Sequence, residues 1–401
     1  MKWASSISRA DAVETAVGHA AVSIAESFGE LSADLAIVFV SPDLPGDITT
    51  LTRKLETHFP AAYIIGCTAR GVIGGGEEEE CTPALSLTCA SMPGVDIIPI
   101  YTDGLDLPDG DAPPQAWRDC LGIREGVDPH FVVMADPFTP RVNDFIEGLD
   151  YVWPDSVKVG GIASGGQSRG QNVLFTETQV HRKGMVAVAL SGNISVSTAV
   201  AQGCRPIGDA LKITDCETNV LMEVNGEPPL HYLERLSATL SEEDRELMRH
   251  SLFVGIDTDL LATSGEEEHR EYLIRNLIGI DKDVGALVVS EALHVGRTVR
   301  FHVRDRIASA QDIETTLRSC IGQADYTRPE GALLFSCLGR GENLYGVGGH
   351  DTNCFRETMG EVPLGGFFCN GEIGPVGGTT HIHGYTSAFG LFRPARALLT
   401  G

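Results

Sequence analysis

A pattern of strands, helices and glycines that occurs three times limits the folds open to this chain more than any other feature. Each copy starts with an apolar run that predicts a buried strand, at Leu35–Pro42, His130–Pro137 and Gly331–Gly341. A helical or turn-rich segment follows, then a second apolar strand that runs into glycines, then a further strand. Similarity at a fixed spacing predicts a duplicated scaffold, the alternative being unrelated strands that each end at glycines.

The glycine-rich segments read "YIIGCTARG" at 63–71, "VKVGGIASGG" at 157–166 and "VPLGGFFCNGEIGPVGG" at 362–378. Glycine has no Cβ, so the backbone can come close to a ligand or to another strand there. We therefore expect Gly365 or Gly366 to need a positive φ or a tight backbone contact. The loops could form a ligand pocket or only structural corners.

With 401 residues, the chain is long enough for two domains. The best boundary follows the turn at Asn225-Gly226, where Pro228 and Pro229 suit the first turn of a helix. We predict an N-terminal helix over residues 1–30, a domain over 31–228 and a second domain over 229–401. The expected fold class is α+β, with internally repeated strand–helix–strand units and mixed or antiparallel sheets flanked by helices.

The net charge of −25 and pI of about 4.8 argue against nucleic acid and against an anionic membrane surface as partners. The acidic run Gly76–Cys81 is expected to be a solvated loop or an exposed helix face. The N-terminus does not resemble a signal peptide, and no apolar run is long enough to cross a membrane. A cytoplasmic protein without membrane insertion, with its ten cysteines as thiols, is therefore expected.

Sequence motifs for catalysis and cofactors are weak. No P-loop, dinucleotide-binding glycine motif or nucleophile elbow is present, and no two cysteines form a C-x-x-C pair. His381 and His383 would lie on one face of a strand and could hold a metal or haem, but paired structural histidines are commoner. A cysteine nucleophile is possible, but the sequence singles out none of the ten scattered cysteines. We expect neither an enzyme nor a dedicated metal or cofactor, and leave haem open.

Six stretches occur in this order along the chain: "YIIGCTARGVIGGG", "VGGIASGGQ", "ITDCETNVLMEVNGEPPLHYL", "GALLFSCLGRGENLYG", "VPLGGFFCNGEIGPVGG" and "HGYTSAFGLFRP". Together they resemble the FIST family of sensory domains, named for F-box and intracellular signal-transduction proteins. The resemblance covers about residues 30–395 and implies FIST N-terminal and C-terminal domains. It also implies a non-enzymatic protein that binds amino acids or similar polar metabolites for signal transduction. Alternatives are a haem-binding nitric oxide sensor and a module that recognises a protein substrate; a cysteine-dependent hydrolase is less favoured.

No kinase, cyclase, chemotaxis or F-box segment is recognisable, so a separate output protein such as a kinase is the expected partner. In the glycine loops, Glu372 would suit the amino group of a ligand, and Arg340 or nearby backbone amides would suit its carboxylate. The candidate ligand-binding residues are Arg340, Gly341, Asn343, Cys369, Asn370, Glu372, His381, Cys67 and Arg70.

Overall fold

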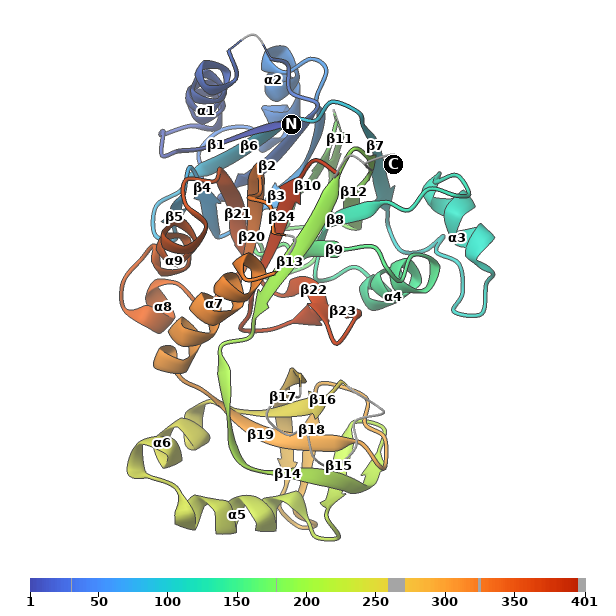
Figure 1. Cartoon of the computed structure of the whole chain (residues 1–401), viewed down its shortest axis with the longest axis vertical. Coiled ribbons are helices and arrows are strands. Elements are labelled where there is room, and N and C mark those ends of the chain that lie inside the picture. Colours follow the sequence, from blue (N-terminus) through green and yellow to red (C-terminus); the bar gives the residue numbers. More distant parts are fainter. Residues whose placement is uncertain (30, 178, 259–270, 324–325, 396–401) are drawn as a thin grey trace. The chain divides into compact units, whose positions relative to one another are not determined.

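The structure is a computed structural model that describes residues 1–29, 31–177, 179–258, 271–323 and 326–395 (Figure 1). It contains two compact units. Unit 1 combines Met1–Ala201 with the segment from Ile313 onward, and unit 2 is Gln202–Asp312. Unit 2 is therefore inserted in the sequence between two parts of unit 1.

Within the described residues, the strands of unit 1 form three six-stranded sheets that share one strand order. The orders are β1-β6-β2-β3-β10-β11, β7-β12-β8-β9-β22-β23 and β13-β24-β20-β21-β4-β5. The bounds are β1 Lys2–Ser8, β2 Leu35–Val40, β3 Tyr63–Thr68, β4 Gly71–Gly74, β5 Glu77–Glu79, β6 Leu85–Ser91, β7 Val95–Thr102, β8 His130–Ala135, β9 Lys158–Ile162, β10 Leu174–Thr176, β11 Gln179–His181, β12 Met185–Gly192, β13 Ser195–Ala201, β20 Gly331–Cys337, β21 Leu364–Cys369, β22 Glu372–Val376, β23 Thr379–His383 and β24 Ser387–Arg393.

The repeat predicted from the sequence forms the centre of each sheet. The parallel pairs β2–β3, β8–β9 and β20–β21 are its three copies. The hairpin that follows each pair leaves its own repeat: β4–β5 joins β21, β10–β11 joins β3, and β22–β23 joins β9. The three repeats are thus tied together in a ring, each completing the sheet of another.

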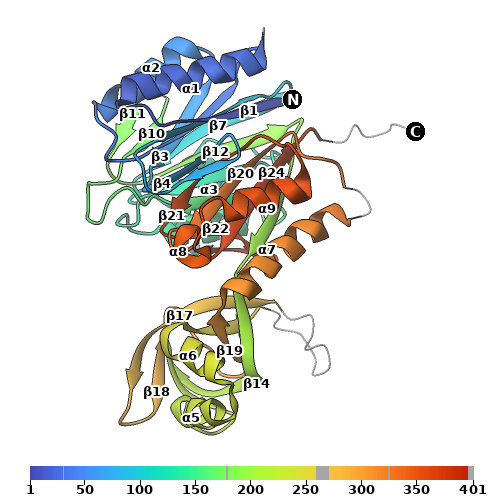
Figure 2. The same cartoon turned by 90° about the vertical axis from the view of Figure 1, so that its left-hand side faces the viewer.

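Each sheet has one face in a shared central core, because residues of β2, β8 and β20 belong to one apolar cluster. Helices cover the other faces: α1 and α2 on the first sheet, α3 and α4 on the second, α7 and α9 on the third. Figure 2 shows α1 and α2 together over the first sheet. The bounds are α1 Val13–Phe28, α2 Leu51–His58, α3 Pro114–Leu121, α4 Val142–Val152, α7 Arg306–Ile321, α8 Glu342–Tyr345 and α9 His350–Met359. The predicted α+β class is confirmed.

One glycine in each repeat is required by a close approach of neighbouring backbones. A Cβ on Gly66, Gly160 or Gly366 would lie 1.8 Å from the carbonyl oxygen of the residue opposite it on the parallel strand. These three positions define equivalent residues in the three repeats. The expected backbone constraint at Gly365 or Gly366 is confirmed, since Gly366 has that contact at a φ of 152°.

The N-terminal segment is more than the predicted helix. Strand β1 precedes α1 and pairs with β6, so it supplies an edge strand of the first sheet. Trp3 is buried in the central core and stacks on Phe392, with ring centroids 4.8 Å apart. The alternation of small and large residues in this strand was too weak to predict it.

In unit 2 the described strands close into a barrel in the order β14-β15-β18-β17-β16-β19, with α5 and α6 beside it. The bounds are β14 Cys204–Glu217, β15 Val220–Val224, β16 Leu252–Asp257, β17 Tyr272–Asp281, β18 Ala286–Val289, β19 Thr298–Arg304, α5 Pro229–Thr239 and α6 Glu242–His250. The turn at Asn225-Gly226 and the helix starting at Pro229 occur as predicted. Both lie inside unit 2, where the turn follows β15 and the helix is α5. The compact units divide instead after Ala201 and after Asp312.

Candidate functional site

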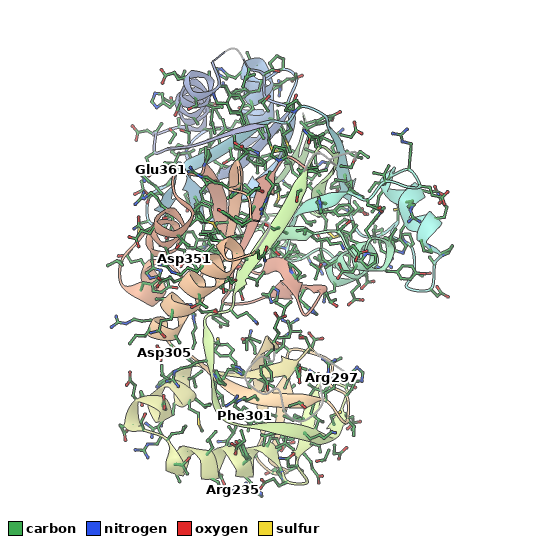
Figure 3. The ribbon with its side chains drawn as sticks, in the orientation of Figure 1. Arg235, Arg297, Phe301, Asp305, Asp351 and Glu361 are labelled. Atoms are coloured by element: carbon green, nitrogen blue, oxygen red, sulfur yellow. The ribbon has the colours of Figure 1, made fainter. Side chains whose placement is uncertain are left out.

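Glu372 and Arg340, the two main candidates from the sequence, are both fully buried and have partners within the chain. Arg340 donates from Nε to Asp351 over 2.9 Å and from Nη2 to the hydroxyl of Tyr345 over 2.6 Å. Asp351 lies in the first turn of α9 (Figure 3). This pairing neutralises the charge of Arg340 within the protein, so the guanidinium is not presented to a ligand.

Glu372 stands in a position that is apolar in the other repeats. The residue after each repeated glycine is paired with a residue of the neighbouring hairpin. These pairs are Phe367 with Val72, Cys67 with Leu174 and Gly161 with Glu372. Val72 and Leu174 belong to the central core. Glu372 accepts a hydrogen bond from the Thr386 N–H over 2.9 Å and one from the Cys369 thiol over 3.4 Å.

In the sheet β13-β24-β20-β21-β4-β5, two serines on the face covered by α9 make the same kind of departure. Ser336 on β20 and Ser387 on β24 are paired in register. The corresponding pairs are Val40 with Leu85 and Ala135 with Met185. Both serines donate to Asp351, over 3.3 Å and 2.5 Å. The third repeat alone therefore has polar groups at these positions of its sheet.

The buried carboxyl groups of the third repeat have pKa values that are pushed apart. Burial opposes ionisation of Asp351, but the charge of Arg340 and hydrogen bonds from His350, Arg340 and Ser387 hold its pKa below the usual range. Burial raises the pKa of Glu372 to about 8, although its hydrogen bonds and Arg340 act in the opposite direction. At neutral pH, Asp351 is therefore charged and Glu372 mostly neutral.

The acidic run at Glu77–Glu80 is not the solvated loop or exposed helix face that was expected. Glu78 on β5 accepts hydrogen bonds from the N–H groups of Gly349 and Thr352, over 3.1 and 2.9 Å, at the start of α9. Glu80 accepts from the Glu342 N–H over 2.9 Å, at the start of α8. Burial and the charge of Asp351 raise the pKa of Glu78 to about 7. The helix ends lie about 270 residues further along the chain, so no local pattern could have shown these contacts.

The two candidate cysteines are poorly placed for thiolate chemistry. Cys67 and Cys369 are buried in the central core, and burial raises the pKa of each thiol well above its ordinary value. A thiol held neutral is a weak nucleophile and a weak metal ligand. Within the described residues, no group of three or more His, Cys, Asp or Glu side chains could hold a metal ion. Haem binding stays an untested alternative.

Arg70 and Asn370 meet where equivalent strand ends come together. The N–H of Arg70 donates to the hydroxyl of Ser164 over 3.1 Å, and that hydroxyl donates to the Phe368 carbonyl over 2.5 Å. Asn370 donates to the Ala163 carbonyl over 3.0 Å. The structure thus joins the ends of β3, β9 and β21, but these contacts are structural links between repeats.

The other three candidates are scattered. Asn343 lies exposed on α8 and donates weakly to the Leu338 carbonyl over 3.4 Å. Gly341 precedes α8, and a Cβ there would overlap the Glu80 carboxylate. His381 is half-buried on β23, beside Ile382 in the sequence. Ile382 lines a pocket that the sequence did not predict.

This pocket, which we call the α4 pocket, has a volume of about 390 Å³ and lies where β8 and β9 end and α4 begins. Three side chains supply apolar walls: Val142, Ile162 and Ile382. The remaining lining residues are Pro137, Thr139, Arg141, Asn143 and Asp144. In Figure 1, α4 lies beside β9 and the β22–β23 hairpin. The pocket therefore brings together elements of the second and third repeats.

The charged groups of the α4 pocket are fixed by the chain. The Arg141 guanidinium donates to the carbonyls of Leu107 and Pro108, both over 2.8 Å, and pairs with Asp144 over 2.7 Å. Both side chains are partly exposed, 27% for Arg141 and 51% for Asp144. The signal available in the sequence was a buried strand ending in "ADP" before a helix, a common ligand position in open sheets.

Two mycobacterial proteins resemble the chain over almost its whole length. A Mycobacterium tuberculosis protein described as uncharacterized is 35% identical over 389 residues, covering 96% of this chain and 98% of that protein. A Mycobacterium bovis protein, also described as uncharacterized, is 35% identical over 386 residues, covering 95% and 96%. An F-box/LRR-repeat protein of Arabidopsis thaliana is 28% identical over 105 residues, which cover 25% of this chain and 20% of that protein.

Among solved structures, a cyanuric acid hydrolase from A. caulinodans matches 98% of this chain and 100% of its own, at 9% identity and a TM-score of 0.34. A likeness this distant supports no argument about fold or function. No helix among the described residues is both long and apolar enough to span a bilayer.

Family models settle the membership that the sequence motifs suggested. The FIST N domain matches residues 34–227, and the FIST C domain matches residues 231–375. The first match ends shortly after β15 and the second begins within α5, so the two matches meet inside unit 2. Together they cover most of the described fold, and the chain is therefore a member of the FIST family.

Proposed function

We propose that this FIST protein is a cytoplasmic sensor that binds a small polar metabolite, such as an amino acid, in the α4 pocket. The observation that carries the proposal is the pocket itself, whose volume of about 390 Å³ suits a small metabolite. Its apolar walls and few polar groups are typical of ligand sites. It also lies outside the carboxyl ends of parallel strands, where open sheets commonly bind ligands.

The arrangement of repeats gives a physical route from binding to signalling. Ile382 belongs to the hairpin of the third repeat, while Val142 and Asn143 belong to the second. A ligand that contacts both sides would stabilise the packing of one repeat against the other. We propose that a separate output protein, such as a kinase, recognises the changed packing.

A larger pocket, of about 500 Å³, supports this function less well. It lies at the opposite ends of the strands, where Asp34 precedes β2 and Tyr63 begins β3. The amino ends of parallel strands are not the usual ligand position. The α4 pocket is therefore our candidate for the sensory site.

A thermal-shift screen with amino acids and common metabolites tests the proposal. Binding at a hundredfold excess over Kd should stabilise the protein by about 2.7 kcal/mol. Val142→Phe should fill the pocket and remove the response. Val22→Phe is the matched control, because Val22 is 55% exposed on α1 and lies outside the pocket. A screen without any stabilising compound, or an equal response from both variants, would reject the α4 pocket as the sensory site.

A further inference from the structure

The start of α9 shows what this fold can bind at such a place, because the chain supplies the occupant itself. Both oxygens of the Glu78 carboxylate accept backbone hydrogen bonds, from Gly349 over 3.1 Å and from Thr352 over 2.9 Å. These donors are the N-cap and the third residue of α9. The free N–H groups and the dipole of a helix start favour an anion. At α9 the burial of Glu78 and the charge of Asp351 act against it and raise the Glu78 pKa to about 7.

Register places Glu78 and Ile382 at the same position of two repeats. Glu78 pairs with Ile73, which lies opposite Gly366, one of the repeated glycines. Ile382 pairs with Ile373, which lies opposite Gly160, the equivalent glycine of the second repeat. The side chain that closes the start of α9 is thus a carboxylate, whereas its counterpart beside α4 is an isoleucine.

The two helix starts also share their backbone shape. The N-cap residue of α9, Gly349, has φ 76° and ψ 15°, and that of α4, Arg141, has φ 61° and ψ 26°. Counting from these caps, Arg141 corresponds to Gly349 and Asp144 to Thr352. Within the described part of the chain, no acceptor lies on the backbone N–H of Arg141 or Asp144. The same two donors are therefore free beside the α4 pocket.

We propose that the α4 pocket binds its ligand through a carboxylate, which takes the place that the Glu78 carboxylate holds at α9. The ligand class is a small carboxylic acid whose apolar part lies against Val142, Ile162 and Ile382. This inference rests on the proposed function, since it names the chemistry by which the same pocket would recognise its metabolite.

The charges near the pocket favour a carboxylate over a phosphate. Asp144 lies in the first turn of α4 and is paired with Arg141, so that cation is already largely neutralised. A dianion would meet stronger repulsion from Asp144 than a singly charged group. The start of α9 has matching groups. Glu78 supplies the carboxylate from another strand, Asp351 is the acid in the first helical turn, and Arg340 is the arginine paired with that acid.

The first experiment compares acids with their amides in wild-type protein. The probes are amino acids, 2-hydroxy acids and short aliphatic carboxylates, each with its amide, together with inorganic phosphate. Titration is followed by calorimetry and by the amide NMR signals of Arg141 and Asp144. An acid should bind at least tenfold more tightly than its amide and than phosphate, and should shift both signals. Equal affinity of acid and amide, tighter binding of phosphate, or unmoved signals would overturn the proposal.

Ile382→Glu provides a second, independent test by placing the equivalent of Glu78 beside α4. The attached carboxylate should compete for the two donors and weaken binding of the best acid at least tenfold. Val22→Glu adds the same charge on the exposed face of α1 and should leave binding unchanged. Unchanged binding in folded Ile382→Glu would also overturn the proposal; should this variant not fold, the NMR comparison in wild type decides.

Failure of this inference can be told apart from failure of the proposed function. If an amine or other neutral metabolite binds in a way that Val142→Phe removes, the pocket is the sensory site and only the carboxylate is wrong. If no compound of either panel binds and Val142→Phe changes nothing, both proposals fail.

Discussion

Glu372 shows how one residue acquires its properties from distant parts of the chain. Its type and its place beside glycines are visible in the sequence, and they suggested a ligand contact. Its burial comes from β9 and from Thr386, which belong to different repeats. Arg340 is similar, since its partner Asp351 lies on another element. Chemical identity was therefore predictable at this site, whereas burial and partners depended on how the sheets assemble.

The raised pKa of Glu372 predicts a specific dependence of stability on pH. Burial raises this pKa from 4.5 in the unfolded chain to about 8 in the folded state. The folded state therefore holds a proton more tightly, and the stabilisation is fully present below pH 4.5 and lost as the pH rises through 8. The loss should be on the order of a few kcal/mol, because one pKa unit corresponds to about 1.4 kcal/mol.

Glu372→Gln should remove this contribution while keeping the shape of the side chain. Urea unfolding at pH 5, 7 and 9 should show wild type losing more stability than the variant across the series. Glu78, whose pKa is raised to about 7, contributes in the same direction and remains in both proteins. Parallel curves for the two proteins would show that Glu372 does not titrate in this range.

At the level of elements, the two central strands of each repeat were predictable because their apolar runs and glycines are local signals, whereas their parallel pairing is shown only by the structure. The hairpin β4–β5 was not predictable, because its acidic strand looks like a solvated segment until its partners are known. Glu78 and Glu80 cap two helices of the third repeat. The burial of this acidic run could not be predicted for a physical reason. Its partners are backbone N–H groups, which every residue type except proline has, so the sequence does not identify them.

Gly366→Ala tests the backbone contact that defines the repeat. The added Cβ would lie 1.8 Å from the Leu334 carbonyl oxygen, so β20 and β21 would have to separate. We expect a loss of about 2 kcal/mol or more in unfolding free energy. Gly18→Ala is the matched control, since Gly18 lies in α1 with no atom within 4 Å of its Cβ. That change should stabilise by about 0.5–1 kcal/mol; equal effects in thermal unfolding would refute the assignment.

Glu78→Ala tests whether the start of α9 is an anion site. Removing the side chain leaves the N–H groups of Gly349 and Thr352 without their acceptor, which should cost about 1–3 kcal/mol. Acetate at millimolar concentration should restore part of the melting temperature, and acetamide should not. Loss of stability without rescue by acetate would mean that the site accepts only the tethered group.

At the scale of the molecule, the threefold repeat was visible in the sequence, but the exchange of hairpins between repeats was not. Periodicity identifies similar units, and only strand register shows that each unit completes another. The same limit applies to the insertion of unit 2. The turn and proline pair near residue 228 is a clear local signal, yet it connects two elements of one barrel unit.

The exchange of hairpins predicts that unit 1 folds only when all three repeats are present. Deleting Gln202–Asp312 and joining the ends with a short glycine-serine linker should leave a protein that unfolds in one cooperative transition. The ends of the insert are close, because the Gly203 N–H donates to Asp312 over 2.9 Å.

A fragment of residues 1–227, cut where the family models meet, should not unfold cooperatively. It lacks β21 and β24, the partners of β4 and β13, and it divides the barrel of unit 2. Calorimetry and circular dichroism would distinguish the two products, and a cooperative 1–227 fragment would show that the first two repeats are stable without the third.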